Sequence, residues 1–146
     1  MKKYRLTDDK IIVKCRTLYR IQALRDFGDV KEGEFGGWIE SEKNLSHDGN
    51  AWVYGNAWVS DDARVSGDAD IKTAGDICSM SGFGSEYRTT TAFRTKNGDV
   101  HVSCGCFFGS LEAFCQRVES THGNNLFGRE YKKMIEMLKI HFEVEP

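Results

Sequence analysis

The hydrophobic and polar positions between Asn50 and Ile77 recur every six residues. In this register one column holds small residues, a second holds β-branched residues and a third holds Asn or Asp. The three columns are Ala51, Ala57, Ala63, Ala69 and Gly75; Val53, Val59, Val65, Ile71 and Ile77; and Asn50, Asn56, Asp62 and Asp68. The period matches neither an α-helix nor a single amphipathic strand. It predicts an internal repeat in which short strands alternate with tight turns.

Strand geometry explains why the columns differ in residue type. Side chains two positions apart on a strand share a face, so the small and β-branched columns point into the same interior. Asn, Asp and Gly tolerate the left-handed backbone that tight corners require. An ordinary β-meander is the alternative, but it would not keep the side-chain sizes in register. We therefore expect a coil of short strands.

The repeat resembles the hexapeptide-repeat proteins, in which an aliphatic residue is followed four positions later by a small one. The matching pairs are Val53 with Ala57, Val59 with Ala63, Val65 with Ala69, and Ile71 with Gly75. The resemblance implies a short left-handed parallel β-helix, three hexads to a turn, and often a trimer. It says little about function, because the same scaffold carries acyltransferases, carbonic anhydrase-like enzymes and structural proteins.

The flanks of the repeat predict two end modules, and the fold class is mainly β. Strand-like runs at 10–15 and 17–24 predict an N-terminal β cap over residues 1–35, which would cover the open end of a coil over 36–83. Residues 84–146 predict a ββαα module. Its strands flank an Asn97-Gly98 hairpin turn, and its first helix has Ser110 as N-cap. A second helix is expected over roughly 129–142.

A second resemblance concerns the lead-in to the repeat. Residues 18–24, 36–40, 44–46 and 49–53 look like a family of uncharacterised bacteriophage and prophage proteins with the same lead-in. The resemblance implies a small accessory protein made in an infected bacterial cytoplasm. It transfers no catalytic residue to this chain.

Charge is distributed unevenly, although the net charge is only −2. Residues 1–25 carry eight basic and two acidic side chains, whereas residues 26–86 carry four basic and thirteen acidic ones. The acidic middle argues against direct nucleic-acid binding, which needs clustered positive charge. It predicts an acidic face for a basic protein partner, formed by Asp61, Asp62 and Asp68. The alternative is that acidic corners simply keep the repeat soluble.

The outward positions of the repeat predict an oligomer or partner interface. An eighteen-residue turn would place Trp52 beside Asp70, Tyr54 beside Lys72 and Trp58 beside Asp76. Exposed aromatic side chains at such density usually mark interfaces. The predicted interface residues are Trp52, Tyr54, Trp58, Arg64, Asp70 and Asp76. We expect self-association, a trimer by analogy; the alternatives are that the terminal caps cover these side chains or that a foreign ligand does.

Catalytic and metal-binding chemistry has few candidates. A hexapeptide-type acyltransferase would need a histidine as general base, and His47 is the histidine within the coil. It lies at a predicted corner with no insertion to build a pocket. Cys104 and Cys106, with Cys115 and His122, offer zinc ligands, but strand alternation places the first two on one face, where buried thiols commonly pack. We expect no catalytic residue, no metal and no cofactor.

Together these features predict a non-catalytic phage accessory protein that binds and inhibits a component of host antiviral defence. One alternative is sequestration of a small signalling nucleotide between subunits, with its phosphates on Arg20, Arg25 or Arg64. A hexapeptide-type acyltransferase and a structural virion protein are the others.

The sequence also predicts a cytoplasmic location. It has no apolar run of membrane-spanning length, and Met1-Lys2-Lys3-Tyr4 lacks the apolar core of a signal peptide. The five cysteines show no disulfide-framework spacing, which favours free thiols in a reducing compartment.

Overall fold

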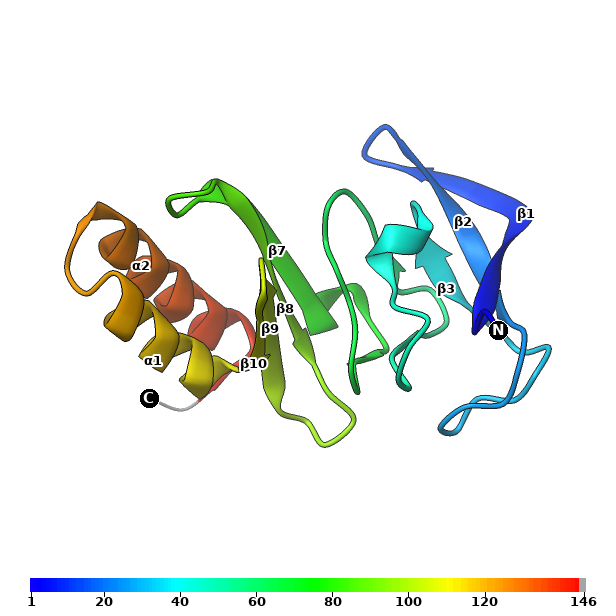
Figure 1. The fold of residues 1–146 in the computed structure, drawn as a ribbon. Coiled ribbons are helices and arrows are strands. Elements are labelled where there is room, and N and C mark those ends of the chain that lie inside the picture. The colour runs from blue at the N-terminus through cyan, green and yellow to red at the C-terminus, as the bar shows by residue number, and fades with distance from the viewer. Residues whose placement is uncertain (145–146) are drawn as a thin grey trace.

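A computed structural model describes residues 1–144 of the chain, and its N-terminal region is built on a mixed four-stranded sheet (Figure 1). Strands β1 (Tyr4–Val13) and β2 (Arg16–Ala23) form an antiparallel hairpin. Strand β3 (Phe35–Ile39) pairs antiparallel with β2, and β5 (Trp58–Val59) pairs parallel with β3. The sheet order is therefore β1-β2-β3-β5.

The repeat segment contributes very short pieces of regular structure. Strand β4 (Trp52–Val53) pairs parallel with β6 (Asp70–Ile71), and Leu45 makes an isolated parallel bridge with Val65. The 3₁₀ turns η1 (Glu42–Asn44) and η2 (Ala74–Asp76) flank these pairs. Each parallel pairing of strands involves two residues per strand.

The predicted left-handed parallel β-helix is wrong. Across residues 1–144 the strands form a mixed sheet, an antiparallel sheet and one two-stranded parallel pair. Two physical reasons account for the difference. Each hexad supplies only two residues of extended backbone before an Asn, Asp or Gly corner interrupts pairing. The longer flanking strands, β2 and the strand over Arg88–Arg94 (β8), instead form the sheets with antiparallel partners.

The six-residue pattern nevertheless marks which side chains are buried. Val53, Val59, Val65 and Ile71 are all at most 2% exposed and belong to one hydrophobic core. Trp52 joins the same core, with its ring 5.1 Å from that of Phe27. Gly36 makes this packing possible, because a Cβ there would lie 2.7 Å from the Trp52 ring.

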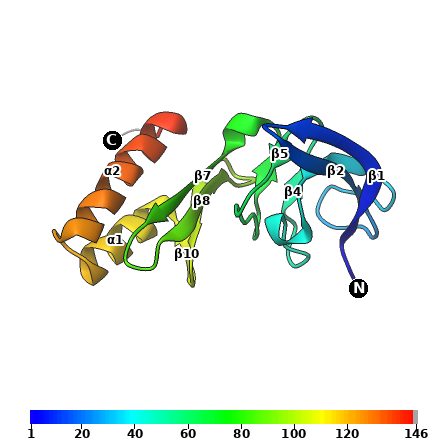
Figure 2. The same cartoon turned by 90° about the horizontal axis from the view of Figure 1, so that it is seen from above.

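The C-terminal region is an antiparallel sheet with two helices on one face (Figures 1 and 2). Its strands are β7 (Ile77–Phe83), β8 (Arg88–Arg94), β9 (Val100–Cys104) and β10 (Phe107–Ser110), in the order β10-β9-β8-β7. The helices are α1 (Leu111–Thr121) and α2 (Leu126–His141). The sequence assigned residues 77–83 to the repeat, whereas β7 pairs with β8 in this sheet.

Helix boundaries follow local capping chemistry. The Ser110 side chain accepts a hydrogen bond from the Ala113 amide, as the N-cap prediction requires. Helix α2 begins at Leu126 rather than near Arg129, because Asn125 caps it by accepting from the Gly128 amide. Neither helix in the described part of the chain is long and apolar enough to cross a membrane.

The second face of the C-terminal sheet covers the end of the N-terminal core. Phe93 of β8 is fully buried in that core. The Lys96 amide donates to the Asp68 carbonyl at 2.9 Å, and the Arg64 amide donates to the Thr91 hydroxyl at 3.0 Å. The two helices and the β1–β2 hairpin consequently lie at opposite ends of the molecule (Figure 2).

Candidate functional site

The structure does not place the side chains of the predicted aromatic interface together on an exposed surface. Trp52 is 1% exposed and packs against Tyr4 and Phe27. The prediction that it lies at the surface is therefore wrong. The N-terminal strands cover it, which is the cap alternative. Tyr54 is half-buried against the core, and Trp58 is partly exposed, with the Lys14 ammonium 5.7 Å from its ring. Trp52 does pair with Asp70, whereas Trp58 pairs with Trp38 of β3.

The acidic side chains of the middle segment mostly have basic partners within the chain. Asp61 lies 3.3 Å from Arg16, and Asp62 lies 2.7 Å from Lys43, which holds the pKa of that carboxyl below its usual range. The other two pairs are Asp70 with Lys72 and Asp76 with Arg94, each at 3.5 Å. Asp68 is exposed. Internal pairing therefore weakens the field that a basic partner would meet.

Arg20 and Arg25, the predicted phosphate contacts, are used by the fold. The Arg20 guanidinium donates to the Gly36 carbonyl at 2.8 Å and lies 4.3 Å from the Trp38 ring centre. Arg25 donates to the His47 carbonyl at 3.1 Å. Arg20 therefore contacts strand β3, and Arg25 contacts the segment around His47.

His47 has both ring nitrogens engaged. Nδ1 accepts the Lys3 amide hydrogen at 3.1 Å, and Nε2 lies 2.8 Å from a Glu42 carboxylate oxygen. The neutral tautomer with its proton on Nε2 satisfies both contacts. Its ring also stacks on Tyr4 at 4.1 Å. A general base needs a free ring nitrogen to take the proton of the acyl acceptor. In this arrangement His47 has none, because both ring nitrogens are engaged within the chain.

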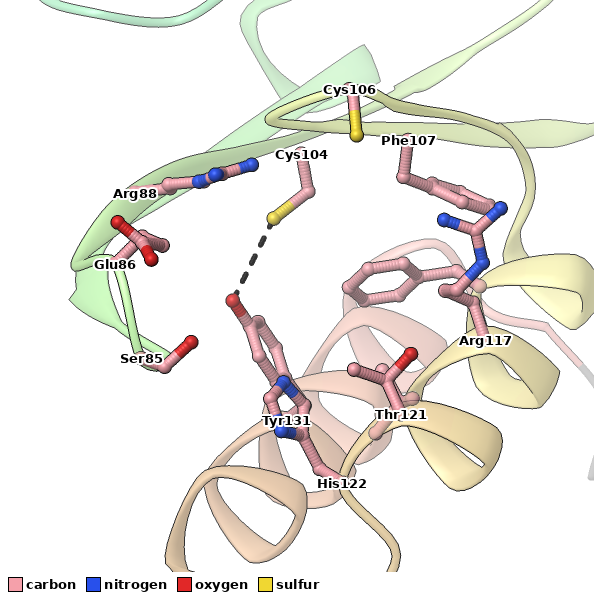
Figure 3. A pocket seen from close by; sticks show the side chains of 12 residues that line it. Ser85, Glu86, Arg88, Cys104, Cys106, Phe107, Arg117, Thr121, His122 and Tyr131 are labelled. Carbon is pink, nitrogen blue, oxygen red and sulfur yellow. Dashed lines mark hydrogen bonds between the residues drawn. The ribbon is translucent and has the colours of Figure 1, made fainter.

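A pocket of about 290 Å³ lies between the C-terminal sheet and its helices (Figure 3), and we call it the helix-face pocket. Its floor is apolar apart from one hydroxyl, and its rim carries most of the polar groups. The floor is Cys104, Phe107, Phe114, Val118 and Tyr131; the rim is Ser85, Glu86, Arg88, Cys106, Arg117, Thr121 and His122.

The floor holds the Tyr131 hydroxyl in a fixed place. Tyr131 reaches from α2 to within 3.7 Å of the Cys104 sulfur (Figure 3), and Thr90 donates to the same sulfur at 3.2 Å. Gly84 leaves room for the ring, because a Cβ at that position would lie 2.6 Å from Tyr131 Cζ. Burial, with the neighbouring Cys104, raises the pKa of Tyr131. The group therefore stays protonated at neutral pH and can donate a hydrogen bond.

The rim places two guanidinium groups on opposite sides of the pocket (Figure 3). Arg88 comes from the start of β8, and Arg117 comes from α1 and lies 5.3 Å from the Phe107 ring centre. Among residues 1–144, neither forms an ion pair with a carboxylate. Glu86 lines the same rim without pairing to either. The pocket therefore carries an excess of positive charge.

The prediction that the two cysteines of the Cys-x-Cys motif share one strand face is wrong. Strand β9 ends at Cys104, which is 8% exposed, and Gly105 has a φ of +60°. This left-handed turn places Cys106 in an exposed position on the rim. Within residues 1–144 no three His, Cys, Asp or Glu side chains are arranged to hold a metal ion.

Sequence reasoning missed Arg88, Arg117 and Tyr131 as a group. They come from a strand, a helix and a second helix, and no local motif joins them. The Cys-x-Cys motif borders the pocket, but sequence reasoning placed it on a strand and weighed it only as a source of zinc ligands.

No family model matches the chain. Over 62 residues it is 37% identical to the uncharacterized acetyltransferase YdcK of Escherichia coli strain K12. The match covers 37% of this chain and 19% of that protein, so the chain spans only about a fifth of its curated relative. This partial similarity agrees with a distant link to hexapeptide-repeat proteins, and it gives no indication of phage origin.

Proposed function

We propose that the protein is a binding module for a small anionic ligand with a flat, apolar body, held in the helix-face pocket. One observation carries this proposal: Arg88 and Arg117 face the same cavity, and neither forms an ion pair with a carboxylate of residues 1–144. Guanidinium groups bind carboxylates and phosphates through paired, charge-assisted hydrogen bonds. An anion between them would offset their mutual repulsion.

The rest of the pocket supports the same class of ligand. Phe107 and Phe114 form an aromatic floor, with ring centres 5.2 Å apart. Flat ligands pack well on such surfaces. The Tyr131 hydroxyl adds one oriented donor from below. The volume of about 290 Å³ is close to the lower end of the range for small-molecule sites, roughly 300 to 1,000 Å³.

This proposal moves the nucleotide-sequestration alternative from a subunit boundary to a cavity within one chain. Inhibition of a host defence component stays a prediction, and the ion pairs of Asp61 and Asp62 reduce the charge on which it was based. The acyltransferase, virion-protein and trimer expectations also stay predictions.

Calorimetric titration tests the proposal directly. The probes are adenosine monophosphate and benzoate, with adenosine and benzamide as their uncharged counterparts. We expect the anions to bind more tightly than the uncharged partners. Arg117→Gln should weaken anion binding about tenfold to a hundredfold, because one charge-assisted hydrogen-bond pair is lost.

Arg129→Gln is the matched control, since Arg129 is exposed on α2 and lies outside the pocket. Its affinity should equal that of the parent protein. Equal anion binding by the parent and by the Arg88→Gln and Arg117→Gln variants would contradict the proposal. Circular dichroism would establish that each variant is folded.

A further inference from the structure

A second pocket lies on the other face of the same sheet, and we call it the sheet-face pocket. Its volume is about 360 Å³, and its walls include Arg64, Arg88, Thr89, Thr91 and Ser103. Side chains alternate between the two faces of a strand. Thr90 contacts Cys104 on the helix side, so its neighbours Thr89 and Thr91 point to the opposite side.

Charge in the sheet-face pocket is positive. Asp62 also lines it, but Lys43 lies 2.7 Å from that carboxylate and neutralises it. Arg64 and Arg88 form no ion pair with any carboxylate of residues 1–144. The Thr89 hydroxyl lies 2.7 Å from Ser81 Oγ, which leaves the Thr91 and Ser103 hydroxyls to donate to a ligand. Two guanidinium groups beside two such hydroxyls match a phosphate group better than a carboxylate. A phosphate has three terminal oxygens to accept hydrogen bonds in different directions, whereas one guanidinium already satisfies a carboxylate.

Arg88 connects the two pockets, because it lines both of them. Its side chain lies across the β9–β10 turn, directly against Gly105. A Cβ at position 105 would coincide with the Arg88 guanidinium and lie 2.8 Å from Arg88 Cδ. Glycine at this position is therefore what allows Arg88 to lie between the pockets.

We infer that the sheet-face pocket is a second anion site, which binds a phosphate group between Arg64 and Arg88. It is separate from the helix-face pocket, because the two pockets lie on opposite faces of the sheet. The phosphate site stands on Arg64, Arg88 and the hydroxyls beside them, and it does not depend on the proposed function.

The two arginines that line only one pocket each separate the two claims. Arg64 lines the sheet-face pocket alone, and Arg117 lines the helix-face pocket alone. Titrations of the full chain with inorganic phosphate, adenosine monophosphate and adenosine would be compared for the parent, Arg64→Gln, Arg117→Gln and the control Arg129→Gln.

We expect Arg64→Gln to weaken the binding of inorganic phosphate at least about tenfold and to leave the binding of adenosine unchanged. Arg117→Gln should weaken adenosine monophosphate but leave inorganic phosphate unchanged. Arg129→Gln should behave as the parent does for all three probes.

Unchanged phosphate affinity in Arg64→Gln would overturn the phosphate site, whatever Arg117→Gln does. Loss of phosphate binding in Arg64→Gln, with no effect of Arg117→Gln on adenosine monophosphate, would overturn the proposed function while leaving the phosphate site intact.

Discussion

The N-terminal and C-terminal regions treat their polar side chains in different ways. In residues 1–76 the fold itself uses most of the buried or half-buried polar groups. Asn44 is the clearest case: its oxygen accepts from the Glu40 and Ser41 amides, and its nitrogen donates to the Asp61 and Ala63 carbonyls. All the hydrogen-bonding capacity of that side chain is satisfied within the chain.

In the C-terminal region, polar groups remain available around a cavity. Arg88 and Arg117 face the helix-face pocket, and the Tyr131 hydroxyl lies at its floor. Groups already satisfied within a fold stabilise that fold, and little of their interaction energy remains for a ligand. The difference teaches that the repeat segment, despite its conspicuous pattern, is mainly scaffold. The less patterned C-terminal region carries most of the groups that can bind, and Arg64 of the repeat segment joins them at the sheet-face pocket.

The largest expected effect tests the claim that the polar side chains of the N-terminal region are already hydrogen-bonded within the chain. Asn44→Leu removes four hydrogen bonds and leaves two amides and two carbonyls without this partner. We expect a loss of about 3–5 kcal/mol in the free energy of unfolding, measured by urea denaturation. Asn124→Ala is the control, because exposed Asn124 contacts only the Lys132 ammonium among residues 1–144. Equal stability of the two variants would break the comparison.

The next effect concerns the buried Lys3, whose ammonium donates to the Ala51 carbonyl at 2.6 Å. Burial, with the nearby Arg25 charge, lowers the pKa of Lys3 to about 8 from its ordinary value of 10.5. Between these two values the unfolded chain binds more protons than the folded chain, so stability rises with pH there. Relative to Lys3→Met, the free energy of unfolding of the parent should rise by up to about 3 kcal/mol between about pH 8 and pH 10.5.

Urea denaturation of both proteins at several pH values measures this difference. Taking the difference between the variants cancels the titration of Tyr and Cys side chains. Below about pH 8 the difference should be flat, because both states then hold the proton. A difference that is flat up to pH 10.5, or that falls, would show that Lys3 is not buried as described.

Tyr131→Phe tests the claim that the C-terminal region keeps polar groups available for a ligand. It removes one donor from the floor of the helix-face pocket, while Thr90 still donates to Cys104. We expect about tenfold weaker binding of adenosine monophosphate, equivalent to ~1.4 kcal/mol, with a smaller change in unfolding free energy. Tyr87→Phe serves as the control, since that side chain is 73% exposed. A large loss of stability without a loss of affinity would make Tyr131 a structural residue.

The smallest expected effect concerns Asp62, which lies between the two regions. Asp62→Asn removes the carboxylate from the wall of the sheet-face pocket and leaves Lys43 without that partner. Phosphate should then bind about two- to threefold more tightly at low ionic strength, and the gain should disappear as added salt screens the charge. Phosphate titrations at low and high salt measure it. Weaker binding would mean that Asp62 itself helps to hold the ligand.

Some features of the fold follow from local chemistry and are predictable. The Val53, Val59 and Val65 positions are buried as the six-residue pattern predicts. Ser110 caps its helix as predicted. In each case the outcome depends on hydrophobicity or on a hydrogen bond between residues close in sequence.

Other features depend on pairing between distant segments, and here prediction failed. The same buried valines are compatible with a continuous parallel coil and with short pairs joined to antiparallel strands. The coil was expected, and the structure has the short pairs. Trp52 was expected at the surface because the residues that cover it, Tyr4 and Phe27, lie outside the repeat and do not appear in its pattern.

The sequence by itself determined which positions of the repeat are buried and where the first helix begins, because hydrophobic burial and capping act over a few residues. Only the tertiary structure decided which strands pair and which arginines are left for a ligand. Arg20 and Arg88 are chemically identical side chains. Arg20 lies beside the Gly36 carbonyl and the Trp38 ring, whereas Arg88 lies against Gly105 between two cavities, and only the packed chain creates those surroundings.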